Sequence, residues 1–366
     1  MRAQQRDSAA RQADAQAHLA AAREPRAAGP GPAAEELRRA YLDVLKLCLC
    51  DLTATSTMSV GAEPDGTVVS RELRGEARQV RSAGMGWPLQ GLTMVGLGRL
   101  DDLASCVETV VREAVEGDMI EAGAWRGGAG ILIRAVLDSL GDGRTVYVAD
   151  SFQGFPEADE RDPDVASLGA FDFLAVPLEE VRDSFARFGC ERGVEFVPGF
   201  FEETLSSLAG RRWSLIRLDG DTYGPTREAL RWLYPGLSAG GYLIVDDYGS
   251  FDGCREAVDE FRAEHGIAEP FEKIDSTCVR WRRTGDEPIG GGADAPLRDG
   301  PVGAPRSVAR PQKTHVPTAR EVELERRLTV LHGRLEAAEA EVARLAGAPW
   351  RGPRAWLQQK VHGARR

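Results

Sequence analysis

Two acidic clusters, each directly after a short apolar run, constrain the fold of this chain most strongly. The first run, Ser214–Leu218, ends in Asp219-Gly220-Asp221, and the second, Gly241–Val245, ends in Asp246-Asp247. The segment between them, Pro225–Leu233, has its apolar residues at helical spacing. A strand, a helix and a strand with short connections form a βαβ unit, in which the strands run parallel. We therefore expect both clusters at one edge of a sheet, where open α/β sheets bind their ligands.

The clusters together contain four carboxylates, Asp219, Asp221, Asp246 and Asp247, with no His or Cys nearby. Oxygen ligands alone suit a hard cation, so the pattern indicates Mg²⁺ rather than Zn²⁺. The competing interpretation is that these acids are merely solvated strand ends, which are common, because short motifs often mislead. That interpretation is the better one for a single cluster, whereas two clusters that end both strands of one βαβ unit favour a metal site.

A glycine-rich turn upstream indicates a second binding site. The predicted strand Asp118–Ala122 leads through this turn into a predicted helix over Ala129–Leu140. A strand, turn and helix of this kind present backbone N–H groups to a ligand at the helix start. The dinucleotide fingerprint GxGxxG is not met, because Glu121, Gly123 and Arg126 occupy its three glycine positions. A pyrophosphate is therefore a poor fit.

The next predicted strand, Thr145–Ala149, ends in Asp150. An acid at the end of the second strand suits the ribose hydroxyls of an adenosine ligand. Gly-rich turns before helices often only permit close packing, so this motif by itself leaves both interpretations open.

The rest of the chain predicts further elements around this unit. Helices are expected at Glu35–Leu52, Leu100–Ala114, Pro177–Phe188, Phe200–Leu208 and Asp252–His265, and strands at Val194–Val197, Phe271–Ile274 and Thr277–Trp281. Thr53–Pro88 is polar and Gly-rich, and we expect a long loop there with one helical piece around Arg71–Val80. Ser151–Val176 combines aromatic and acidic residues, which is typical of a lid or an acceptor-binding segment but also compatible with plain surface.

Composition divides the chain into five parts. We expect a disordered or frayed tail at residues 1–33, the folded domain at 34–283, a linker at 284–317, a coiled-coil helix at 318–347 and a basic tail at 348–366. In the coiled-coil helix, apolar residues alternate at steps of four and three from Leu324 to Leu345. A lone helix cannot bury such a seam, so we expect a homo-oligomer, a coiled-coil partner or docking on the domain.

Charge and cysteine usage narrow the class of protein. The 366 residues carry a net charge of −11, which argues against nucleic acid as a partner. The six cysteines form no CxxC pair and no disulfide-framework spacing, so we expect reduced thiols. No apolar run reaches the roughly 20 residues that span a bilayer, and the N-terminus shows no signal-peptide pattern. We therefore expect no membrane association and a cytoplasmic location.

Five segments resemble the macrocin-type (TylF-like) O-methyltransferases, which modify sugars on natural products. These segments are TMVGLGRLDDL, EAGAWRGGAG, VADSFQGFP, LDGDTYGPT and GGYLIVDDYG. They occur in order and at matching separations between roughly Glu35 and Arg283, and both tails fall outside the resemblance. The resemblance implies a class I, Rossmann-like α/β fold with a mostly parallel seven-stranded sheet and helices on both faces. It also implies the use of S-adenosylmethionine and Mg²⁺.

The resemblance assigns roles to eleven residues of this sequence. It implies that Asp219, Asp246 and Asp247 hold the metal, that Asp221 is the general base, that Glu121, Gly123, Asp150 and Ser151 bind the cofactor, and that Thr93, Met94 and Val95 close over the methyl donor. Gly98 stands where the family often has Lys, Phe200 where it often has Trp, and Gly224-Pro225 where it often has Glu-Ser. These departures leave the identity of the acceptor open.

The residues also fit this chemistry on physical grounds. An alkyl hydroxyl is a weak nucleophile because almost none of it is ionised at neutral pH. Bound Mg²⁺ lowers the pKa of such a hydroxyl and fixes its direction, and a nearby carboxylate can take the proton. In-line attack on the sulfonium methyl then mainly needs positioning. Two adjacent hydroxyls can chelate one ion, so we expect a glycosylated small-molecule acceptor with a vicinal diol.

Two other functions remain open from the sequence. A catechol-type O-methyltransferase would share the fold and the metal. A non-catalytic scaffold would associate through the heptad helix and bind no S-adenosylmethionine.

Overall fold

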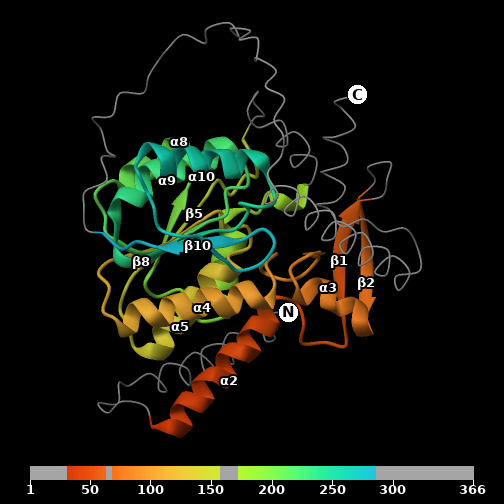
Figure 1. Cartoon of the computed structure of the whole chain (residues 1–366). Helices are drawn as coiled ribbons and strands as arrows, with labels where there is room; N and C mark the ends of the chain where they lie inside the picture. The colour runs from red at the N-terminus through yellow and green to blue at the C-terminus, as the bar shows by residue number, and fades with distance from the viewer. Residues whose placement is uncertain (1–30, 63–67, 157–171, 286–366) are drawn as a thin grey trace, which may run out of the picture. The chain divides into compact units, whose positions relative to one another are not determined.

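A seven-stranded sheet organises the fold (Figure 1). The computed structural model describes residues 31–62, 68–156 and 172–285. The strands lie in the order β6-β5-β4-β7-β8-β10-β9. Their bounds are β4 Asp118–Ala122, β5 Val146–Asp150, β6 Val194–Pro198, β7 Trp213–Leu218, β8 Leu237–Val245, β9 Glu272–Lys273 and β10 Val279–Arg282. The first five strands in this order run parallel, and β10 and β9 are antiparallel to their neighbours. The predicted fold class, a mostly parallel seven-stranded α/β sheet, is confirmed.

Helices cover both faces of this sheet. The helices are α4 Leu97–Arg112, α5 Gly128–Leu140, α7 Leu178–Arg187, α8 Phe201–Thr204, α9 Tyr223–Leu233 and α10 Asp252–Glu264. In Figure 1, α4 and α5 lie on one side of the sheet and α9 and α10 on the other. Successive strand residues point to opposite faces, so Met119 packs in the core with α4 and α5, and Ile120 packs in the core with α9 and α10. Strands buried on both faces read as continuous apolar runs, which is why they were recognisable in the sequence.

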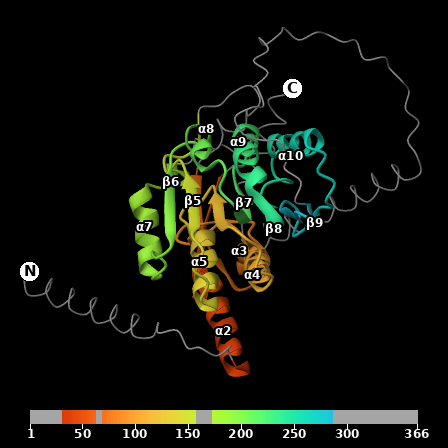
Figure 2. The same ribbon diagram turned by 90° about the vertical axis from the view of Figure 1, so that its left-hand side faces the viewer.

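The strand register aligns the carboxyl ends of the central strands. It pairs Ala149 with Ala122, Ala122 with Leu218, and Leu218 with Val245. The N–H groups that follow continue the ladder: Gly123 donates to Ala149 O at 2.8 Å, Asp219 to Ala122 O at 2.8 Å and Asp246 to Leu218 O at 2.9 Å. Gly123, Asp219 and Asp246 therefore lie side by side at one edge. Figure 2 shows β6, β5, β7 and β8 following one another across the sheet.

The predicted βαβ unit is present as β7, α9 and β8, with its two strands parallel. The other helices and strands predicted within the described domain are also present, with small shifts at their ends. The segment predicted as one helix over Phe200–Leu208 is α8 followed by a 3-10 turn at Leu205–Leu208.

The long loop predicted over Thr53–Pro88 is wrong. The structure has a second, three-stranded sheet there, formed by β1 Ser56–Ala62, β2 Val68–Arg74 and β3 Trp87–Pro88 in the order β2-β1-β3. The helical piece is α3, Arg78–Ser82, and most of the Arg71–Val80 range is strand and 3-10 turn. The strands escaped prediction because two of the buried positions of β1 are polar: Thr57 and Ser59 are both buried. A polar inward residue hides the alternation that identifies a strand.

The chain divides into two compact units after Tyr41, and α2 (Pro32–Leu49) is continuous across the division. In the described part of the first unit, residues 31–41, Arg38 and Arg39 form ion pairs with Glu35. In the second unit, Leu42, Leu45 and Leu49 of this helix are buried. Within the described ranges, no helix combines the length and the apolar character that a membrane span requires. The predicted tail 1–33 (apart from 31–33), most of the linker 284–317, the coiled-coil helix 318–347 and the basic tail 348–366 lie outside the described residues.

Candidate active site

A cavity of about 530 Å³ lies at the carboxyl edge of the large sheet. Its volume is in the range of small-ligand sites. All eleven residues that the sequence singled out line it: Thr93, Met94, Val95, Glu121, Gly123, Asp150, Ser151, Asp219, Asp221, Asp246 and Asp247. Eight of them lie at or just after the ends of parallel strands, which meet at the same edge of the sheet, and Thr93, Met94 and Val95 come from the segment before α4.

Three carboxylates form a close group in this cavity. One oxygen each of Asp219, Asp221 and Asp247 lies within 4.8 Å of the others. Burial raises the pKa of Asp219 to about 6, the Arg217 guanidinium opposes this shift, and the neighbouring Asp247 adds to it. Asp221 has a left-handed backbone with φ of 57°, and such strained residues concentrate at functional sites. An all-oxygen group of this size fits a hard divalent cation.

Asp246 lies next to this group but is held differently. Its carboxylate is buried and accepts hydrogen bonds from two arginines, Arg217 at 2.9 Å and Arg99. Arg99 belongs to α4 and is itself anchored by Asp275 at 2.6 Å and by Thr277. The structure thus brings Asp221, rather than Asp246, into the close carboxylate group.

Arg217 connects the acidic group with the predicted cofactor side of the cavity. It is buried in β7 and donates to Glu121 at 2.7 Å, to Asp219 at 2.9 Å and to Asp246 at 2.9 Å. Glu121 is buried in β4, and burial raises its pKa to about 8 although Arg217 opposes the shift. Among the described residues, no side chain donates to the second carboxylate oxygen of Glu121, Oε2, and the backbone N–H of Gly130 helps to stabilise the Glu121 carboxylate. A buried polar atom of this kind at a cavity wall is available to a ligand.

The glycine-rich turn both packs closely and faces the cavity. Gly123 has a φ of 94°, and a Cβ there would lie 1.9 Å from the carbonyl oxygen of Asp219. Asp150 accepts the N–H groups of Ala124 at 2.8 Å and Trp125 at 3.1 Å, which ties the turn to the end of β5. Burial raises the pKa of Asp150, and these backbone N–H groups act in the opposite direction. Close packing therefore explains Gly123 without excluding a cofactor, because the turn still lines the cavity.

The described ends of the segment Ser151–Val176 also reach the cavity. Ser151, Gly154, Phe155, Pro156 and Leu174 line it, and residues 157–171 lie outside the described part of the chain. The indole N–H of Trp125 donates to Phe173 O at 3.0 Å.

Sequence reasoning missed the arginines of the site. Arg217 stands alone as a charge within the apolar run of β7, and a single charge in a buried strand is the signal that could have predicted an ion pair. Arg99 lies in the segment GRLDD, where an exposed helical face was the simpler interpretation. The aromatic lining residues Trp87, Phe201 and Phe251 carried no signal of their own.

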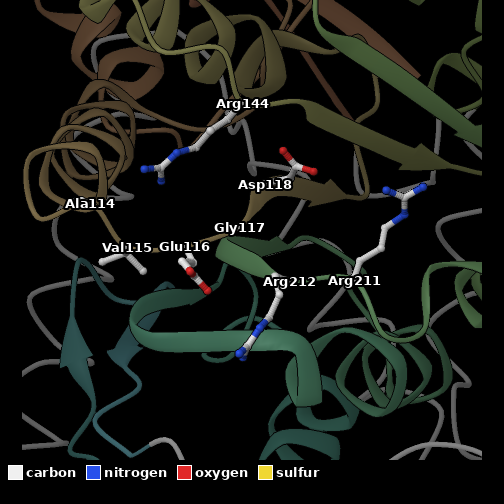
Figure 3. Close-up of a pocket in the computed structure, with 8 residues that line it drawn as sticks. All are labelled: Ala114, Val115, Glu116, Gly117, Asp118, Arg144, Arg211 and Arg212. Carbon is white, nitrogen blue, oxygen red and sulfur yellow. The ribbon is translucent and has the colours of Figure 1, made fainter.

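A second cavity, of about 480 Å³, lies where β4 begins (Figure 3). Arg144, Arg211 and Arg212 line it together with Glu116 and Asp118. The guanidinium groups of the three arginines point in different directions (Figure 3). Arg211 lies over the ring of Tyr147, 4.8 Å from its centroid, and Arg144 pairs with Asp142 at 3.3 Å. These charges do not converge on one point, so the large acidic cavity is the candidate site.

Comparisons with known proteins show the family of this chain. Residues 40–283 match the family model of the macrocin-O-methyltransferases (TylF). The chain is 44% identical over 260 residues to the 8-demethyl-8-(2,3-dimethoxy-alpha-L-rhamnosyl)-tetracenomycin-C 4'-O-methyltransferase of Streptomyces olivaceus, a match that covers 68% of this chain and 95% of that protein. It is 38% identical over 252 residues to the mycinamicin III 3''-O-methyltransferase of Micromonospora griseorubida, covering 67% of this chain and 96% of that protein. The structure of the O-methyltransferase NovP is similar with a TM-score of 0.60 and 38% identity, over 68% of this chain and 100% of that one.

Proposed function

Because this chain belongs to the macrocin O-methyltransferase (TylF) family and is an S-adenosylmethionine-dependent O-methyltransferase, we propose that it methylates a sugar hydroxyl of a glycosylated natural product with the help of Mg²⁺. The observation that carries the proposal is the group of three carboxylates, Asp219, Asp221 and Asp247, in the same cavity as the glycine-rich turn. Metal-assisted methyl transfer requires that carboxylates able to bind a metal ion and a turn able to bind the cofactor lie in the same cavity.

Asp219, Asp246 and Asp247 are the proposed metal ligands. Asp219 and Asp247 belong to the close carboxylate group, and Asp246 is adjacent in sequence to Asp247. The two arginines on Asp246 do not disqualify it, because ligating carboxylates are usually oriented by hydrogen bonds from further residues. When bound, Mg²⁺ would supply Lewis acidity that favours ionisation of a hydroxyl.

Asp221 is the proposed general base. Its carboxylate lies in the close group and at the cavity wall, within reach of a hydroxyl held there. Glu121, Gly123, Asp150 and Ser151 are proposed to bind S-adenosylmethionine. Oε2 of Glu121, to which no described side chain donates, and Oδ1 of Asp150, which accepts the N–H of Phe152 at 2.8 Å, can each accept a further hydrogen bond from S-adenosylmethionine.

The acceptor is proposed to be a sugar with a vicinal diol. Two adjacent hydroxyl oxygens can share one hard cation, and the aromatic residues Trp87, Phe155 and Phe251 line the cavity with apolar surface for the rest of the acceptor. The name of the Streptomyces olivaceus relative describes a rhamnosyl substrate and 4'-O-methylation. This favours a sugar over the catechol that the sequence left open.

The test is a methylation assay with isotopically labelled S-adenosylmethionine and a panel of acceptors. The panel contains glycosides with a vicinal diol, the same glycosides with one of the two hydroxyls removed, and simple catechols. We expect methylation of the diol glycosides only, loss of activity after chelation, and recovery on adding Mg²⁺. Preferred turnover of catechols would assign the other acceptor class, and full activity after exhaustive chelation would remove the metal from the mechanism.

A further inference from the structure

The segment from Gly86 to Val95 forms one wall of the cavity, and most of it lies outside helices and strands. Only Trp87 and Pro88 belong to a strand, and Trp87, Thr93, Met94 and Val95 line the cavity. Backbone carbonyls outside helices and sheets still need hydrogen-bond donors when they are buried. The position of this wall therefore depends on what donates to its carbonyls.

Arg81 donates to four of these carbonyls. Its side chain is fully buried, at 0% exposure. It makes five hydrogen bonds to backbone carbonyls: Nε to Cys50 at 3.2 Å, Nη1 to Gly86 and Met94 at 2.8 Å each, and Nη2 to Thr93 at 2.9 Å and Val95 at 2.6 Å. A planar guanidinium can hold several carbonyls in one fixed arrangement, which no other side chain can do.

The charge of Arg81 is balanced mainly by carbonyl dipoles, and the nearby Asp51 carboxylate also stabilises it. No ion pair of Arg81 occurs among the described residues, and burial lowers its pKa. Burying a cation in this way is costly unless its N–H groups are satisfied. Four of the five carbonyls that accept hydrogen bonds from Arg81 belong to this wall. Burying Arg81 is therefore tolerated mainly when the wall keeps this position.

Arg126 holds the same wall from the other side. It belongs to the glycine-rich turn, and its Nη1 donates to Leu89 O at 2.8 Å and to Gly91 O at 3.0 Å. The N–H of Gly128 donates to Leu92 O at 2.9 Å. The wall is thus fastened to the turn that carries Gly123.

We propose that Arg81, assisted by Arg126, is a positioning residue that presets the Thr93–Val95 wall for S-adenosylmethionine. The inference rests on the proposed function and on the expectation from the family resemblance that Thr93, Met94 and Val95 close over the methyl donor. A wall that is already ordered binds its ligand without the entropy cost of ordering it. Loosening the wall should therefore lower the affinity for S-adenosylmethionine. Binding of the acceptor near the close carboxylate group should be affected less.

The test compares Arg81→Lys with a matched control, Arg134→Lys. Arg134 is also a buried arginine, and it also donates to backbone carbonyls, Arg144 O at 2.6 Å and Asp142 O at 2.9 Å. It does not line the candidate cavity. Calorimetry measures the Kd of S-adenosylhomocysteine, thermal unfolding measures stability, and steady-state kinetics give KM for donor and acceptor.

For the wild-type chain, binding of S-adenosylhomocysteine tests the cofactor side of the proposed function; failure to bind would overturn that function and leave no donor site for Arg81 to preset. Given binding, we expect Arg81→Lys to raise the Kd about tenfold or more, since a lysine can replace few of the lost hydrogen bonds to the wall. Arg134→Lys should lose comparable stability and keep its Kd within about twofold. The acceptor KM at saturating donor should stay within about threefold in both variants.

Arg126→Gln provides the second arm, because Arg126 is partly exposed and its loss should not prevent folding. We expect a several-fold rise in the Kd of S-adenosylhomocysteine for this variant even if Arg81→Lys fails to fold. Unchanged donor affinity in folded Arg81→Lys overturns the proposal, as does an equal loss in Arg134→Lys. If Arg81→Lys does not fold, unchanged affinity in Arg126→Gln overturns it.

Discussion

At the scale of single residues, Asp221 and Asp246 differ in what holds them. Asp246 is only 2% exposed and is bonded by two arginines, whereas Asp221 is half-buried at the cavity wall and lies in the close carboxylate group. The proposed function makes Asp246 a metal ligand and Asp221 a base. The two roles have different kinetic consequences, so they can be separated.

Asp221→Asn should lower kcat about 10²- to 10⁴-fold, the usual contribution of a general base, while the Mg²⁺ concentration for half-maximal activity stays the same. Asp246→Asn should raise that Mg²⁺ concentration by about tenfold to a hundredfold or more, and calorimetric titration with Mg²⁺ should show the same loss. Both variants should still bind S-adenosylhomocysteine. If Asp221→Asn shifts the Mg²⁺ requirement and Asp246→Asn leaves it unchanged, the metal belongs to Asp219, Asp221 and Asp247.

The acids that end the strands were predictable from the sequence, whereas the contacts of Arg99 and Arg81 were not. Asp219 and Asp246 end apolar runs, and the parallel arrangement of such runs follows from the short connections between them. Arg99 and Arg81 meet their partners only through the tertiary fold: Arg99 reaches Asp275, which lies far along the chain, and Arg81 binds carbonyls in a segment without pattern. Long-range contacts of this kind leave no periodic trace in a sequence.

At the scale of elements, the ends of β4 and β7 approach so closely that only glycine fits between them. A Cβ at Gly123 would lie 1.9 Å from Asp219 O, and the φ of 94° is unfavourable for other residues. Gly123→Ala should therefore displace Asp219 and lower both stability and Mg²⁺ affinity. We expect a loss of at least about 1–3 kcal/mol, or several degrees in Tm, in thermal unfolding.

Gly98→Ala is the matched control for this prediction. Gly98 lies in the first turn of α4 and is exposed, and a Cβ added there would meet no atom within 4 Å beyond its own stretch of helix. The variant should be neutral or stabilised by up to about 1 kcal/mol, because alanine favours helix over glycine. If Gly123→Ala proved as stable as Gly98→Ala, the ends of β4 and β7 could move apart without cost, and the prediction would be wrong.

The elements themselves were predictable where burial was two-sided. The central strands β5, β7 and β8 are largely apolar and buried, and the helices around the sheet have apolar residues at helical spacing. The small sheet was missed because its inner face is partly polar, as at Ser59, which is buried and donates to Trp87 O at 3.1 Å. A strand whose inner face is partly polar is indistinguishable from a loop by hydrophobic pattern alone.

At the scale of the whole molecule, acidity is the dominant electrostatic feature. The chain has a net charge of −11. Among the described residues, nine acids and one arginine line the candidate cavity: Glu121, Asp150, Glu202, Glu203, Asp219, Asp221, Glu228, Asp246 and Asp247 with Arg217. Such a field attracts the sulfonium of S-adenosylmethionine and a divalent cation, and it opposes an acceptor that carries a phosphate.

We therefore expect the enzyme to prefer an uncharged glycoside over a phosphorylated one. For two acceptors that differ only by a phosphate, kcat/KM should be about tenfold or more lower for the phosphorylated acceptor, because like charges brought together at a binding site cost several kcal/mol. The difference should shrink in high salt, which screens exposed charges. Glu202 and Glu203 are exposed at the cavity, so the double variant Glu202→Gln, Glu203→Gln should also reduce the difference. Equal kcat/KM for both acceptors at low salt would contradict this prediction and show that the phosphate of the acceptor lies outside the acidic field.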